Sequence, residues 1–264
     1  TVPYYRKLFK ELNFNPVDFK NFTDLNCLPF LTKEIIRNDY DQFISETYRK
    51  EDLLFMTTGG STGNPMKIPM NKEFRSLNHA NTRYYLNVAG FIPGEERSIR
   101  LHGDSIPKKL LDQDQFWQVE GNRLTMSVHH LKENTIHLYL DKINSFGAKY
   151  IHAYPSAAVI LMGYIKKFNL QLTRDIKAIF TDSETTLPWQ KSLIEEVSNA
   201  KIFNTYGHTE GAGVGITFPD SDYINVLPQV GYMEIIGNDL ESVDEHDLLS
   251  KLIETSASKD KPIL

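Results

Sequence analysis

The sequence is poor in the features that would place a protein outside the cell, in a membrane or on a nucleic acid. It holds one cysteine, Cys27, so no disulfide can form within the chain, which fits the reducing cytoplasm. No apolar run approaches the roughly 20 residues of a membrane span, and the first residues lack the apolar core of a signal peptide. The net charge of −5 argues against a nucleic acid or an anionic membrane as the main partner. We therefore expect a cytoplasmic protein, with Cys27 buried among its apolar neighbours.

What the sequence contains is an ordinary globular balance, with 41% hydrophobic and 24% charged residues. Its 264 residues suffice for one large domain or two modest domains, each with a hydrophobic core. His129, His130 and His152 lack the spacing of metal ligands, so no zinc site is expected.

Helical and extended segments alternate regularly over residues 135–206. Apolar residues with a period of about 3.6 predict helices, and short apolar runs between them predict strands. Strands that alternate with helices of this length indicate βαβ units and a parallel sheet, and therefore an α/β fold. The expected helices are 135–146, 155–168 and 188–198, and the expected strands are 149–153, 177–181 and 201–206.

The segments on either side of this region are less regular. Residues 104–123 have no clear period, and we expect them to be irregular. After Gly211, β-like segments at 213–218, 231–236 and 251–255 predict a smaller antiparallel unit packed on the main sheet. The other expected helices are 3–13, 33–43 and 72–90, and the other expected strands are 53–56, 66–69, 98–102 and 124–128.

Three loops follow strands of the predicted parallel sheet. In open parallel sheets, ligands bind beyond the carboxyl ends of the strands. We therefore expect these loops to face one crevice. The loops are Tyr154-Pro155, Asp182-Ser183-Glu184 and Gly207-His208-Thr209-Glu210.

The stretch Thr57-Thr-Gly-Gly-Ser-Thr-Gly63 combines three glycines with four hydroxyl residues. Glycine lets the backbone turn sharply, and consecutive backbone N–H groups in such a turn form a site for anions. Lys67 follows and can add a positive charge. The pattern therefore predicts a phosphate-binding loop, although Asn64-Pro65-Met66 separates Gly63 from the lysine, unlike the common phosphate loop. A flexible turn between two strands, with Lys67 as an ordinary surface lysine, is the alternative.

Two motifs carry a resemblance to a known family. Thr58-Gly-Gly-Ser-Thr-Gly-Asn-Pro-Met-Lys67 resembles the phosphate-binding motif of the adenylate-forming enzymes, and Tyr206-Gly-His-Thr-Glu210 resembles their Y-G-x-T-E motif. Thr181-Asp-Ser-Glu184 is similar, more loosely, to a GGE-like turn of the same enzymes. The chain looks most like the acyl-CoA ligase-like branch that contains phenylacetate–CoA ligase, coenzyme F390 synthetase and the CapK-type proteins. The resemblance covers the chain from Leu28 to about Ile236.

The resemblance implies the large N-terminal domain of the adenylate-forming fold, with parallel-rich sheets flanked by helices. Residues 1–212 would form α/β ATP-binding subdomains, and residues 213–264 would form a β-rich part of the same domain. The implied activity is ATP-dependent adenylation of a small carboxylic acid, followed by thioester formation with CoA. Two alternatives remain open: adenylyl transfer to a hydroxyl, as in coenzyme F390 synthetase, and a CapK-type component of capsular polysaccharide biosynthesis. A homodimer is compatible with the resemblance.

The resemblance also implies roles for individual residues. Lys67, Thr209 and Glu210 would be catalytic, with Glu210 holding Mg²⁺ and Thr209 contacting the α-phosphate of ATP. Ser183, Glu184 and Tyr206 would contact the adenine, and Gly207 would also bind the nucleotide. The substrate acid would meet His102, Gly103, Tyr154 and Asp182. The β- and γ-phosphates would be bound by Thr57, Thr58, Gly59, Gly60, Ser61, Thr62, Gly63 and Lys67.

The family next expects a ribose-binding aspartate, a hinge and a C-terminal lid domain with a catalytic lysine. The chain ends at Leu264, before these features. We therefore expect the 264-residue chain alone to bind nucleotide weakly and to adenylate poorly.

Overall fold

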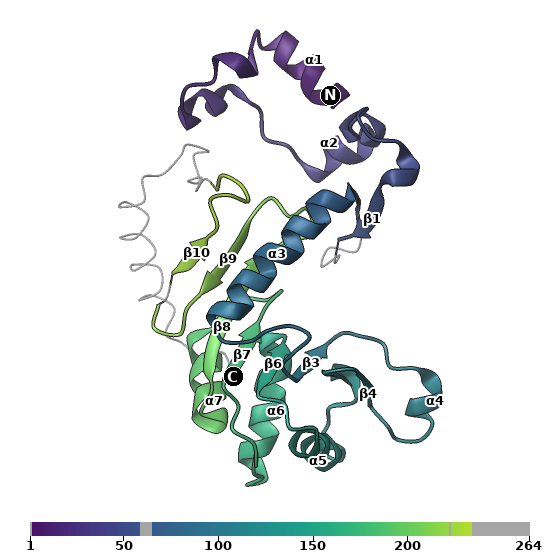
Figure 1. Cartoon of the computed structure of the whole chain (residues 1–264), viewed down its shortest axis with the longest axis vertical. Coiled ribbons are helices and arrows are strands. Elements are labelled where there is room, and N and C mark those ends of the chain that lie inside the picture. Colours follow the sequence, from purple (N-terminus) through teal and green to yellow (C-terminus); the bar gives the residue numbers. More distant parts are fainter. Residues whose placement is uncertain (1, 59–64, 222, 234–264) are drawn as a thin grey trace. The chain divides into compact units, whose positions relative to one another are not determined.

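A computed structural model describes residues 2–58, 65–221 and 223–233 (Figure 1). Its contacts divide the chain into a first unit, Thr1–Glu96 with His208–Gly211, and a second unit, Arg97–Gly207 with Ala212–Leu264. Gly59, Gly60, Ser61, Thr62 and Gly63 of the predicted phosphate loop lie outside the described residues, as do positions 234–236 and 251–255 of the predicted strands.

The first unit begins with short helices. A proline at the first helical position starts α1, as its fixed φ allows, and the Thr32 hydroxyl accepts a hydrogen bond from Ile35 N (3.3 Å) to cap α2. These elements, all within the described residues, bury no side chain completely. They are α1 (Pro3–Glu11), the 3-10 helices η1 (Pro16–Asp18) and η2 (Phe22–Cys27), α2 (Lys33–Asn38), η3 (Tyr40–Phe43) and η4 (Lys50–Asp52).

Two expectations for this region were wrong. The helix predicted over 33–43 is two elements, because Asp39 leaves the helical conformation with φ −126° and ψ 36°. Asn38 and Asp39 are residue types that bond to nearby backbone and disfavour helix interiors. Cys27 is exposed rather than buried, and its Sγ donates a hydrogen bond to Asp24 O (3.2 Å).

The rest of the first unit is a hairpin followed by a long helix. β1 (Leu54–Thr57) pairs antiparallel with β2 (Lys67–Met70), as expected for the two strands around the glycine-rich stretch. α3 (Lys72–Val88) begins at Asn71, whose Oδ1 accepts a hydrogen bond from Phe74 N (2.7 Å). The predicted helix over 72–90 is thereby confirmed to within two residues at its end.

Among the described residues, the second unit is built on an eight-stranded sheet in the order β10-β9-β8-β7-β6-β3-β5-β4. The neighbours β8, β7, β6, β3 and β5 are parallel to one another, while β4, β9 and β10 run antiparallel at the two edges. The predicted α/β fold with a parallel sheet is confirmed. The strands are β3 (Ser98–His102), β4 (Trp117–Glu120), β5 (Arg123–Ser127), β6 (Tyr150–Ala153), β7 (Ala178–Thr181), β8 (Lys201–Gly207), β9 (Val214–Thr217) and β10 (Ile224–Val226).

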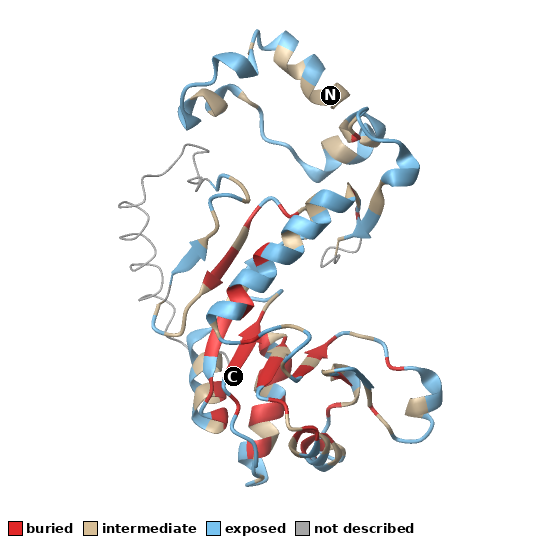
Figure 2. Cartoon of the chain, viewed as in Figure 1, coloured by how far each residue is buried: buried red, intermediate tan, exposed pale blue. Residues whose placement is uncertain are grey.

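Helices α5 (Ile136–Phe146), α6 (Pro155–Lys167) and α7 (Pro188–Ser198) supply the helical half of the core. One face of the sheet carries fully buried aliphatic residues, and these join buried helix residues in a single cluster. Figure 2 shows buried residues concentrated in these strands and helices. Burial of this apolar face is what fixes the strands that lead to the site. The cluster includes Ile99, Leu101, Ile151, Ile179, Ile202, Ile143, Leu161 and Ile194.

Several elements differ from the sequence-based expectation. Residues 104–123 are not all irregular, since they contain α4 (Lys108–Leu111) and β4. β9 and β10 are antiparallel, as predicted for this region, but they extend the main sheet at its edge, whereas the pattern predicted that they pack on it. Residues 231–233 are not in a strand, and the rest of that predicted strand is not described. The division at residue 212 stays a prediction.

Candidate functional site

The site begins at the edge of the sheet where the parallel strands end. Arg100, His152, Phe180 and Phe203 lie next to one another in register on β3, β6, β7 and β8. Side chains alternate between the two faces of a strand, so residues two positions further along point to the same face. His102, Tyr154 and Asp182 occupy those positions at or just beyond the ends of their strands, and Thr205 occupies the equivalent position within β8.

His102, Tyr154 and Asp182 come together at this edge. The rings of His102 and Tyr154 are stacked, with centroids 4.5 Å apart and planes within 3°. His102 Nε2 lies 3.5 Å from Asp182 Oδ2. This nitrogen is buried and makes no hydrogen bond with any described residue. Gly103 follows directly and faces the Tyr154 ring. The four residues that the resemblance assigned to the substrate acid are therefore neighbours in the structure.

Charged groups around His102 affect its ionisation in opposite directions. Burial lowers the pKa of His102, the Asp182 carboxylate raises it, Arg100 lowers it and Asp104 raises it. Arg100 Nε donates a hydrogen bond to Asp104 Oδ2 (2.7 Å), so its charge is largely compensated. The balance favours the neutral imidazole.

His152 is the second titratable group on this face. Burial lowers its pKa to about 3, with smaller contributions from His102 and Arg100. Its ring stacks on Phe180, with centroids 4.7 Å apart. His152 is therefore neutral at physiological pH and serves the packing of the sheet.

The turn after β7 is held by several hydrogen bonds. Ser183 has a φ of +66°, a conformation that costs energy for a residue with a Cβ, and its Oγ donates to Asp182 Oδ1 (2.6 Å). The Glu184 carboxylate accepts hydrogen bonds from Ser156 N (3.0 Å) and Ser156 Oγ (2.9 Å) at the start of α6. Ser183 and Glu184 therefore shape the turn, and their predicted contact with adenine stays a prediction.

The end of β8 carries the first residues of the second motif. The Thr205 hydroxyl donates to Thr181 O (3.1 Å) and ties β8 to β7. Tyr206 and Gly207 follow, and both are exposed. An exposed tyrosine ring at the carboxyl end of a parallel strand can pack against a flat base.

In the first unit, the glycine-rich stretch is closed at its base by two hydrogen bonds. Thr58 N donates to Met66 O, and Met66 N donates to Thr58 Oγ1, each at 2.9 Å. Thr57 and Lys67 are cross-strand partners, and both are exposed. The hairpin thus presents Lys67 beside the start of the predicted phosphate loop.

The acidic turn of the second motif also belongs to the first unit. His208 Nδ1 lies 3.1 Å from Glu210 Oε2, and Thr209 between them is half-buried. Gly211 has a φ of +68°, and a Cβ there would lie 2.2 Å from Asn78 Nδ2 of α3. The turn therefore packs closely on the helix that follows the hairpin.

The fit of this turn to Mg²⁺ depends on the ligands it offers. The described residues include no group of three or more His, Cys, Asp or Glu side chains that could hold a metal ion. Mg²⁺ is usually held by one or two carboxylates, with waters and substrate phosphates completing its shell. A single Glu210 carboxylate is compatible with that mode.

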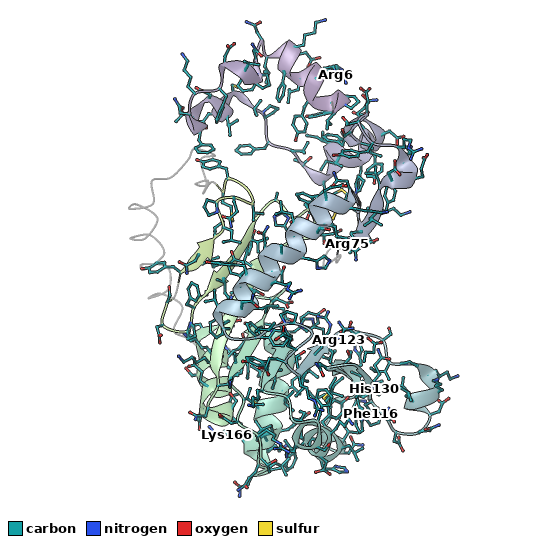
Figure 3. The ribbon with its side chains drawn as sticks, in the orientation of Figure 1. Arg6, Arg75, Phe116, Arg123, His130 and Lys166 are labelled. Carbon is teal, nitrogen blue, oxygen red and sulfur yellow. The ribbon has the colours of Figure 1, made fainter. Side chains whose placement is uncertain are left out.

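Sequence reasoning missed another cluster in the second unit, at the edge of the sheet where the parallel strands end. Ser127 ends β5, and its Oγ lies 2.8 Å from His130 Nδ1. Tyr139 Oη donates to Ser127 O (2.6 Å), and the His130 ring stacks on Phe116 with centroids 5.0 Å apart (Figure 3). Ser127 is only 2% exposed, so the pair holds the end of β5 in place. Nothing in the residue spacing signals this cluster, because Phe116 lies in the stretch without a period.

The chain is similar to two curated proteins, although no family model matches it. It is 28% identical over 211 residues to Protein CapK of Staphylococcus aureus, covering 79% of this chain and 46% of that protein. It is 23% identical over 222 residues to phenylacetate-coenzyme A ligase of Thermus thermophilus, covering 82% of this chain and 48% of that protein. These two similarities support the predicted resemblance to the adenylate-forming, acyl-CoA ligase-like superfamily. It spans about half the length of the curated relatives it matches.

Solved structures show the same fold. The structure of 2-hydroxyisobutyryl-CoA ligase in complex with 2-HIB-AMP and CoA in the thioesterification state has a TM-score of 0.57 at 16% identity, covering 84% of this chain and 49% of that one. The same ligase in the postadenylation state with R3-HIB-AMP also has a TM-score of 0.57 at 16% identity, covering 81% and 47%. The predicted adenylate-forming fold is confirmed. None of the described helices has the length and apolar character needed to cross a membrane.

Proposed function

We propose that this chain forms the nucleotide- and acid-binding part of an ATP-dependent ligase that converts a carboxylic acid to its CoA thioester. The observation that carries the proposal is the edge of the sheet where His102, Tyr154 and Asp182 meet. The fold around that edge is the fold of a ligase solved with an acyl adenylate and CoA.

The reaction would proceed in two steps. A carboxylate oxygen of the acid attacks the α-phosphorus of ATP, and pyrophosphate leaves with the electrons of the broken phosphorus–oxygen bond. The thiol of CoA then attacks the acyl carbon, and AMP leaves. Charge develops on phosphate oxygens in the first step, so fixed positive charge and N–H donors stabilise its transition state.

The described residues suit these tasks. Lys67 is exposed beside the closed base of the hairpin and would neutralise phosphate charge. Glu210 would hold Mg²⁺, and Thr209 would contact the α-phosphate. The exposed Tyr206 ring would pack against adenine. The contacts of Gly59, Gly60, Ser61, Thr62 and Gly63 with phosphate, the cytoplasmic location and a homodimer stay predictions.

The proposal is tested by ATP–pyrophosphate exchange with the full-length protein and a panel of aliphatic and aromatic carboxylic acids. One class of acid should stimulate exchange, and Lys67→Ala and Glu210→Gln should each lower that rate tenfold or more, on the order of the loss of one charge-stabilising group. Lys109→Ala and Asp141→Asn alter exposed charges elsewhere and serve as controls. A protein that shows no exchange with any acid would contradict adenylation.

A second candidate function concerns the acceptor. Identity to CapK is higher than identity to the CoA ligase, 28% against 23%. This favours a test of the CapK-type alternative in capsular polysaccharide biosynthesis and of adenylyl transfer to a hydroxyl. Incubation with ATP, acid and CoA separates them from the first proposal, because thioester formation consumes free thiol and releases AMP. Retention of AMP in the product would instead indicate adenylyl transfer.

A further inference from the structure

We propose that His102 is the general base that takes the proton of the acceptor thiol during acyl transfer, and that Asp182 positions it. The inference rests on the proposed function. It adds the group that activates the acceptor, which neither the motifs nor the relatives assign.

The geometry of the pair is that of a base with an orienting carboxylate. His102 ends β3 and Asp182 follows β7, so the two side chains come from different strands of one sheet. His102 Nε2 lies 3.5 Å from Asp182 Oδ2, and the His102 side chain is only 4% exposed, against 33% for Asp182. Nε2 has no hydrogen-bond partner in the described part of the chain. Buried polar atoms are nearly always paired, so an unpaired nitrogen beside a carboxylate points to a function.

The ring has little freedom to turn. Tyr154 stacks on it at 4.5 Å with planes within 3° of each other. Hydrogen bonds between catalytic groups are often long before substrate binds and shorten in the complex. The 3.5 Å separation is therefore compatible with an orienting contact that tightens when the acyl adenylate is bound.

The chemistry follows from the tautomer that this contact favours. A proton on Nε2 faces Asp182, which leaves the basic lone pair on Nδ1. The thiol sulfur attacks the acyl carbon of the adenylate, a carbon–sulfur bond forms, and the bond from that carbon to the phosphate oxygen breaks. AMP leaves with the electron pair, the thiol proton passes to Nδ1, and Asp182 stabilises the imidazolium. Water then removes the proton.

The charged and titratable groups that face His102 within the second unit act on its pKa in opposite directions. They are Asp182 after β7, Arg100 and Asp104 on and after β3, and His152 on β6. Burial lowers the pKa of His102 from its ordinary value, so the ring is neutral near neutral pH. The carboxylates of Asp182 and Asp104 oppose that effect and favour the protonated ring.

The other histidines at this edge are less suitable. His152 has a pKa of about 3 and stacks on Phe180, so it is a weak base in a packed position. His130 has its Nδ1 engaged with the Ser127 hydroxyl at 2.8 Å. His102 is the histidine of this edge that combines an unpaired nitrogen with a carboxylate neighbour.

The test compares the two half-reactions in the full-length protein. ATP–pyrophosphate exchange reports adenylation, and single-turnover transfer from the enzyme-bound acyl adenylate to CoA reports the second step, between about pH 6 and about pH 9. The variants are His102→Gln and Asp182→Asn. His129→Gln, which changes an exposed histidine in the same unit, is the matched control.

In His102→Gln, transfer should fall about 100-fold, and roughly tenfold more than exchange. The difference in transfer rate between His102→Gln and the wild type should become smaller as the pH approaches a thiol pKa of about 8.5, because thiolate then forms without a base. In Asp182→Asn, the acidic limb of the transfer profile should move to lower pH, because the carboxylate that raises the His102 pKa is gone.

Each other outcome is decisive. If His102→Gln lowers both rates equally, or leaves transfer at the wild-type rate at all pH values, His102 is not the base. Neither result contradicts the proposed adenylation activity. If His102→Gln does not fold, the test rests on the pH profile of acyl transfer in Asp182→Asn. An acidic limb at the same pH as in the wild type would overturn the proposal. A wild-type protein without exchange would overturn the proposed function and this inference together, which separates the two failures.

Discussion

Glu184 and Ser156, 28 residues apart in the sequence, are joined by two hydrogen bonds between the turn after β7 and the start of α6. The backbone N–H of Ser156 is one of the unpaired donors of the first helical turn, and the carboxylate satisfies it. A negative charge there also interacts favourably with the positive end of the helix dipole. The turn that carries Asp182 is thereby tied to the helix that follows Tyr154.

Replacing Glu184 with alanine should weaken this connection. The bonds are solvent-exposed, so we expect the free energy of unfolding to fall by about 1 kcal/mol, as for the loss of a helix cap. Glu184→Gln keeps a hydrogen-bonding oxygen and should lose less. Urea unfolding measures both, and Asp141→Asn, an exposed carboxylate on α5, is the control for charge alone. An Ala variant as stable as the wild type would show that the two bonds contribute nothing.

Acid should destabilise the protein through His152. Its pKa of about 3 in the folded state lies below the value of about 6.5 expected when unfolded. The unfolded chain therefore binds more protons between these values, and the free energy of unfolding falls as pH drops below about 6.5. The slope from one such group is at most about 1.4 kcal/mol per pH unit.

The measurement is urea unfolding at about pH 7 and about pH 5. His152→Phe keeps an aromatic ring against Phe180 and removes the titrating group, so its stability should change less between the two pH values. His129→Gln, an exposed substitution, should follow the wild type. An unchanged pH dependence in His152→Phe would assign the acid sensitivity to other groups, His102 among them.

The regular part of the fold could be predicted because its signals are local. The helix 188–198 begins at a proline and carries a periodic apolar face, and its bounds were confirmed. The parallel strands are short apolar runs between such helices. β4 shows no clear apolar run in the sequence. It is an edge strand, and only two of its four residues are partly buried. β10 has three residues, too few to show an alternation.

The site was predictable in part for the same reason. The placement of His102, Tyr154 and Asp182 at strand ends follows from the parallel sheet, so their proximity could be expected. The bond between Glu184 and Ser156, and the pair of Ser127 with His130, depend on which loops meet after folding. The spacing of residues in the sequence does not predict these two contacts, because the residue types that form them are common on protein surfaces.

Gly211 should tolerate a side chain poorly. Its φ of +68° costs an alanine about 1 kcal/mol or more, and the new Cβ would collide with Asn78 Nδ2 at 2.2 Å. Gly121 has a φ of +56° with no atom within 4 Å of a Cβ, so Gly121→Ala measures the backbone cost alone. Gly211→Ala should therefore destabilise more than Gly121→Ala in urea unfolding. Adding Asn78→Ala should recover the difference, and a failure to recover it would contradict the collision.

The Thr58 hydroxyl should set the affinity for ATP through the shape of the hairpin. Its Oγ1 accepts the hydrogen bond from Met66 N that closes the glycine-rich stretch. Thr58→Val keeps the size of the side chain but leaves a half-buried N–H unpaired, at a cost of about 1–3 kcal/mol. In the full-length protein, that loss should raise the KM for ATP in pyrophosphate exchange by roughly tenfold, since 1.4 kcal/mol corresponds to that factor. Thr58→Ser retains the oxygen and should keep a KM near that of the wild type. If Val and Ser behave alike, the closing bond does not control the loop.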